Sequence, residues 1–115
     1  MKQTILMFLI MALVLPFPFV ADAGGYAVVV SKATHANKDW KPVVTTLVKK
    51  HDARVIEYEG DFGGVLGKLR TQFPRHTCFV ATPKEATGLF VARVHQLTRE
   101  LDDDPYTDTF WGVLT

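Results

Sequence analysis

Cysteine is almost absent from this sequence, since Cys78 is the only one in 115 residues. One cysteine cannot close a disulfide within the chain, and it cannot supply a structural zinc site of the usual two- to four-cysteine kind. The length suffices for one small domain. The stability of that domain must therefore come from packing and not from covalent or metal cross-links.

An excess of charge of one sign is also lacking. The 13 Lys and Arg residues nearly balance the 12 Asp and Glu residues, and the formal net charge is +1 at pH 7. No basic patch occurs in the order of residues, so we expect no nucleic-acid partner. The four histidines do not share metal-ligand spacing. The glycines do not match the dinucleotide fingerprint, so no nucleotide cofactor is expected.

Residues 1–23 have the pattern of a secretory signal peptide. Lys2 gives a positive start, residues 5–20 are uncharged and mostly apolar, and Ala21-Asp22-Ala23 forms a small-residue cleavage site. A membrane anchor needs about 20 apolar residues, whereas here Pro16 interrupts a shorter run. We predict cleavage after Ala23, a protein secreted to the periplasm or the extracellular space, and no membrane segment after cleavage.

The remaining residues, 24–115, predict alternating strands and helices. Short runs rich in β-branched and aromatic residues predict strands, and apolar residues spaced three and four apart predict helices. The strands are expected at 26–31, 53–58, 76–81 and 110–115, and the helices at about 40–50, 60–72 and 82–101. This pattern indicates an α/β three-layer sandwich with a four-stranded, mostly parallel sheet, as in flavodoxin-like folds. The expected strand order is second, first, third, fourth.

Local signals refine these elements. Asn37 or Asp39 is placed to cap the first helix, and Thr82 with Glu85 three residues later is a capping-box pattern that predicts a helix start. The last strand, 110–115, carries no charge and would form an open apolar edge, which invites aggregation. We therefore expect an incomplete domain, with its missing C-terminal half or a partner chain lying against strand 110–115.

The sequence contains no residue that we assign as a catalytic nucleophile. Ligands of open parallel sheets bind outside the carboxyl ends of the strands. Cys78 falls in mid-strand, whereas reactive cysteines lie at strand ends or helix N-termini, so it is interpreted as a buried structural residue. His35 is expected in a solvated loop after the first strand. No catalytic residue and no cofactor-binding residue is assigned.

Four carboxylates cluster after the last predicted helix, and this is the most distinctive stretch of the chain. Clustered oxygen ligands suit calcium, so the sequence raises a calcium site as a hypothesis. The alternative is a solvated helix stop with an Asx-type turn, which the absence of EF-hand spacing favours. The residues concerned are Asp102, Asp103, Asp104 and Asp108.

Taken together, these segments resemble the start of the gingipain-type cysteine peptidase domain, which has a caspase-like fold. In such peptidases a strand of the Leu-Leu-Val-Gly-Asp type precedes a segment rich in Asp and Tyr, and 78–82 and 104–108 occupy similar places. Ala81-Thr82 stands where the family has Gly-Asp, and the helix from Pro83 is longer than the family's. The segments that carry the resemblance are 26–31, 40–44, 49–51, 54–58, 78–83, 104–108 and 111–115.

The resemblance implies the N-terminal part of a secreted cysteine peptidase. In that family the catalytic His and Cys come later in the chain, and no His here, nor Cys78, matches either motif. The residues given would then be inactive alone, and a peptide would be the substrate only of a full-length peptidase continuing past Thr115. The alternative is a small secreted, non-enzymatic α/β binding module that dimerises through strand 110–115.

Overall fold

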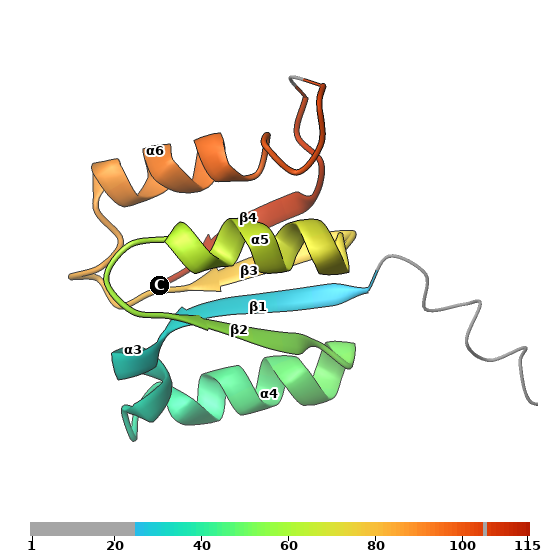
Figure 1. The fold of residues 1–115 in the computed structure, drawn as a ribbon. Coiled ribbons are helices and arrows are strands. Elements are labelled where there is room, and N and C mark those ends of the chain that lie inside the picture. The colour runs from blue at the N-terminus through green and yellow to red at the C-terminus, as the bar shows by residue number, and fades with distance from the viewer. Residues whose placement is uncertain (1–24, 105) are drawn as a thin grey trace, which may run out of the picture.

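The computed structural model describes residues 25–104 and 106–115, so the predicted signal peptide lies outside the described residues. The chain alternates between strands and helices as the sequence predicts (Figure 1). In chain order the elements are β1 (Tyr26–Ser31), α3 (Lys32–Ala36), α4 (Lys41–His51), β2 (Arg54–Tyr58), α5 (Gly63–Gln72), β3 (His76–Val80), α6 (Gly88–Leu97) and β4 (Phe110–Leu114).

The four strands form one parallel sheet in the order β2-β1-β3-β4, which confirms the predicted fold class and strand order. Val28 of β1 pairs with Val55 of β2 and with Cys78 of β3, and Cys78 pairs with Gly112 of β4. All carboxyl ends therefore lie at one edge of the sheet, where ligands of such folds bind. Helices cover both faces, so the molecule is a three-layer sandwich (Figure 1).

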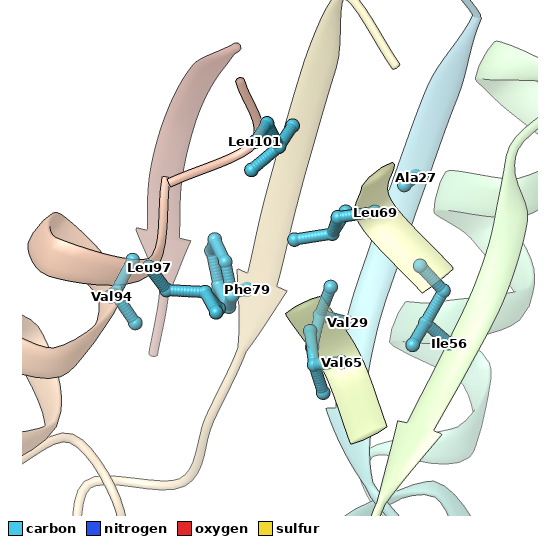
Figure 2. Close-up of a cluster of buried hydrophobic side chains, with 9 residues drawn as sticks. All are labelled: Ala27, Val29, Ile56, Val65, Leu69, Phe79, Val94, Leu97 and Leu101. Carbon is cyan, nitrogen blue, oxygen red and sulfur yellow. The ribbon is translucent and has the colours of Figure 1, made fainter. Parts of the chain in front are cut away.

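The larger core lies between the sheet and helices α5 and α6. Figure 2 shows Phe79 of β3 reaching toward Val94 and Leu97 of α6, while Val65 and Leu69 of α5 contribute from the neighbouring helix. Phe79 is fully buried and makes an edge contact with Trp111 of β4, at 6.4 Å between ring centroids. The other buried members are Ala27, Val29, Ile56 and Leu101.

The opposite face is covered only in part. Val28 and Val30 of β1 and Val80 of β3 pack against Val44 of α4. Side chains alternate across a strand, so Phe110 and Leu114 of β4 point to this same face. They are 67% and 41% exposed, which means that no described helix covers β4 on the α4 side.

The predicted helix over 82–101 is wrong at both ends, because α6 spans only Gly88–Leu97 and Thr98 caps its end. Thr82 and Glu85 do form the reciprocal capping-box bonds, with the Thr82 amide donating to Glu85 Oε1 at 3.0 Å and the Glu85 amide to Thr82 Oγ1 at 3.3 Å. They close only a turn, and α6 begins after Thr87, whose hydroxyl accepts from the Phe90 amide at 3.2 Å. The Glu85 side chain also accepts long-range bonds, as described below.

Two further predictions about the first crossover are also wrong. His35 lies in the short helix α3 and not in a loop, because the Ser31 hydroxyl caps that helix by accepting from the Thr34 amide at 3.1 Å. Neither Asn37 nor Asp39 caps α4. The Asn37 side chain instead accepts from the Asp39 amide at 2.8 Å and shapes the turn between the two helices.

We expect Phe79 to carry a large part of the packing energy. Truncation of a buried phenylalanine to alanine costs about 3–5 kcal/mol, so Phe79→Ala should unfold most of the protein, and the milder Phe79→Leu should cost about 1 kcal/mol. Leu89→Ala, at a side chain 70% exposed, is the control and should change stability by less than about 0.5 kcal/mol. Urea unfolding followed by fluorescence measures all three. Equal losses at both positions would contradict the packing described here.

Candidate functional site

A cleft of about 730 Å³ lies at the carboxyl ends of β1 and β2 and beside the start of α6. This is the position that the topology of an open parallel sheet predicts for a ligand site, and the volume is within the range of small-ligand pockets. Its walls come from α3, from the loop between β2 and α5, and from α6. The lining residues are Ser31, Lys32, Ala33, Ala36, Tyr58, Glu59, Gly60, Asp61, Phe62, Glu85, Thr87, Leu89, Phe90 and Arg93.

Glu85 joins the elements that surround the cleft. The Ser31 hydroxyl at the end of β1 donates to Glu85 Oε2 at 2.6 Å, and the Thr34 hydroxyl of α3 donates to Oε1 at 2.6 Å. The Thr82 amide after β3 also donates to Oε1. One carboxylate therefore holds the ends of two strands and the first turn of a helix in fixed relation.

The surroundings shift the pKa values of two side chains in the cleft. Burial raises the pKa of the Glu85 carboxyl, but the hydrogen bonds from Ser31, Thr34 and Thr82 together outweigh it, so the net shift is downward. Burial, together with the Glu85 charge, raises the pKa of the Tyr58 hydroxyl to about 12. At neutral pH Glu85 is therefore ionised and Tyr58 keeps its proton.

The side chains of His35 and Glu57, whose neighbours in the chain Ala36 and Tyr58 line the cleft, form a hydrogen-bonded pair. His35 Nδ1 lies 2.5 Å from Glu57 Oε2, which joins α3 to the outer strand β2. Since both side chains are substantially exposed, the pair contributes little to stability. The sequence predicted His35 after the first strand, near the carboxyl ends of the strands. It lies there, and its ring contacts the Glu57 carboxylate of β2.

Cys78 lies in the middle of β3 and is half-buried. Burial raises the pKa of its thiol, outweighing hydrogen bonds with Tyr26 and the Leu114 backbone. A raised pKa disfavours the thiolate that nucleophilic chemistry needs. Tyr26, which hydrogen-bonds to Cys78, stacks on the rings of His51 and His76 at centroid distances of 4.1 Å and 5.9 Å.

The predicted acidic cluster is brought together in part. Single carboxylate oxygens of Asp102, Asp104 and Asp108 lie within 4.8 Å of one another, whereas Asp103 is not part of the group. Asp108 Oδ2 accepts from the Leu101 amide at 3.0 Å, and Asp102 Oδ1 accepts from the Asp104 amide at 3.0 Å. The Asx-type turn therefore forms, and the calcium hypothesis stays a prediction.

Sequence reasoning missed Glu85 and Tyr58 as parts of the cleft. The capping-box pattern did single out Glu85, but as a local helix signal. Its partner Ser31 is 54 positions away, and only the fold brings the two together.

Comparisons with family models, curated proteins and solved structures gave no match to this chain. Among the described residues, no helix combines the length and the apolar character needed to cross a bilayer.

Stability should depend on pH through Glu85. Its pKa is lower in the folded than in the unfolded protein, so its contribution is complete at neutral pH and is lost as pH falls from about 4.3 downward. We expect Glu85→Gln to lower stability at pH 7 and to flatten the decline of the free energy of unfolding between pH 5 and 3, as measured by urea unfolding at each pH. An unchanged slope would contradict the assignment. Glu59→Gln, at an exposed neighbour, is the matched control.

Calcium binding is tested by titration calorimetry of the full chain. If the acidic turn is a site, calcium should give heat that disappears in Asp104→Asn and Asp108→Asn variants and persists in Asp103→Asn, because Asp103 lies outside the cluster. Absence of heat in the unmodified protein removes the hypothesis.

Proposed function

We propose that residues 24–115 form the N-terminal part of a secreted, gingipain-like cysteine peptidase domain that is inactive alone. The catalytic His and Cys would come from outside these residues. The observation that carries the proposal is the open edge and bare face of β4, which a further part of the same domain would cover.

The two edges of the sheet differ in a way that supports this proposal. β2 is protected by charged residues, Arg54 and Glu57, as natural edge strands are. β4 has the sequence Phe-Trp-Gly-Val-Leu, without a charge or a proline, and its Phe110 and Leu114 side chains are exposed. Such a strand is suited to lie inside a larger sheet and not at its border.

The chemistry of the cleft is consistent with an incomplete catalytic machinery. Ser31 is the hydroxyl at the end of β1, and it donates to the Glu85 carboxylate and not to a histidine of the described residues. Cys78 lies in mid-strand and faces away from the cleft, on the α4 side. The parallel α/β sheet agrees with the layout that the family resemblance implies, although other families share that layout.

The proposal is tested by the reading frame of the intact gene. We expect coding sequence to continue past the Thr115 codon into further strands and to supply a His and a Cys. A stop codon directly after Thr115 would exclude the peptidase function, because the described residues offer no replacement for these groups.

A second candidate is a non-enzymatic binding module that dimerises through β4, and the arrangement of this strand favours it. In an antiparallel pair of two β4 strands centred on Gly112, Phe110 would face Leu114 of the second copy, and Trp111 would face Val113. Large aromatic residues would thus meet aliphatic ones on both faces of the sheet, as in favourable cross-strand pairs.

Sedimentation of the full chain tests the second candidate. A dimer should form as concentration rises, and Leu114→Lys should shift the dissociation constant at least tenfold toward monomer by placing a charge in the strand pair. Tyr106→Lys, at a side chain 72% exposed, is the control and should leave the equilibrium unchanged. A monomer at all concentrations would eliminate this candidate.

A further inference from the structure

We draw no further inference here: the strongest candidate, the cleft of about 730 Å³ at the carboxyl ends of β1 and β2, belongs to the site already described, and nothing in the structure shows which ligand its lining of three carboxylates and two cations would take.

Discussion

A parallel sheet has to be covered on both faces, and the rest of this structure depends on how far that requirement is met. The crossovers through α5 and α6 cover one face along its whole width, and Phe79 is fully buried there. The crossover through α3 and α4 covers only the half of the other face that belongs to β1 and part of β3. The exposed Phe110 and Leu114 are the direct consequence, and they leave β4 uncovered on the α4 side.

The same connections create the cleft. Because all strands are parallel, the ends of β1, β2 and β3 and the starts of α3 and α6 meet at one edge. The Glu85 carboxylate fixes this edge by accepting bonds from Ser31 and Thr34, and its charge contributes to the raised pKa of Tyr58. The cleft and the open strand β4 thus have different origins. Hydrogen bonds to the Glu85 carboxylate shape the cleft, whereas β4 is open because no described helix covers its apolar side chains on the α4 side.

The fold class and the strand order could be predicted from the sequence, because both depend on which residues are buried. Apolar runs such as 26–31 mark buried strands, and apolar residues spaced three and four apart mark the buried faces of helices. Prediction failed where local patterns compete or distant residues meet. The capping box at Thr82 and Glu85 predicted a helix start, but it closes only a turn and α6 begins after Thr87. The bonds from Ser31 and Thr34 to Glu85 could not be predicted, because they join residues more than 50 positions apart. The acidic turn was recognised in outline, since Asx turns are local. The position of the cleft at the carboxyl ends of the strands was expected, whereas most of its lining was missed because it comes from three separate segments, 31–36, 58–62 and 85–93.

The outer edge of β4 is unpaired among the described residues. The Phe110 amide donates to Arg75 and the Leu114 carbonyl accepts from Ala81, so by the alternation of a strand the Trp111 and Val113 amides point away from β3. Amide hydrogen exchange of the monomeric full chain, resolved by NMR, should show Trp111 and Val113 exchanging at least tenfold faster than Gly112 and Leu114. Equal protection of all four amides would show that the outer edge is already paired and would contradict the account.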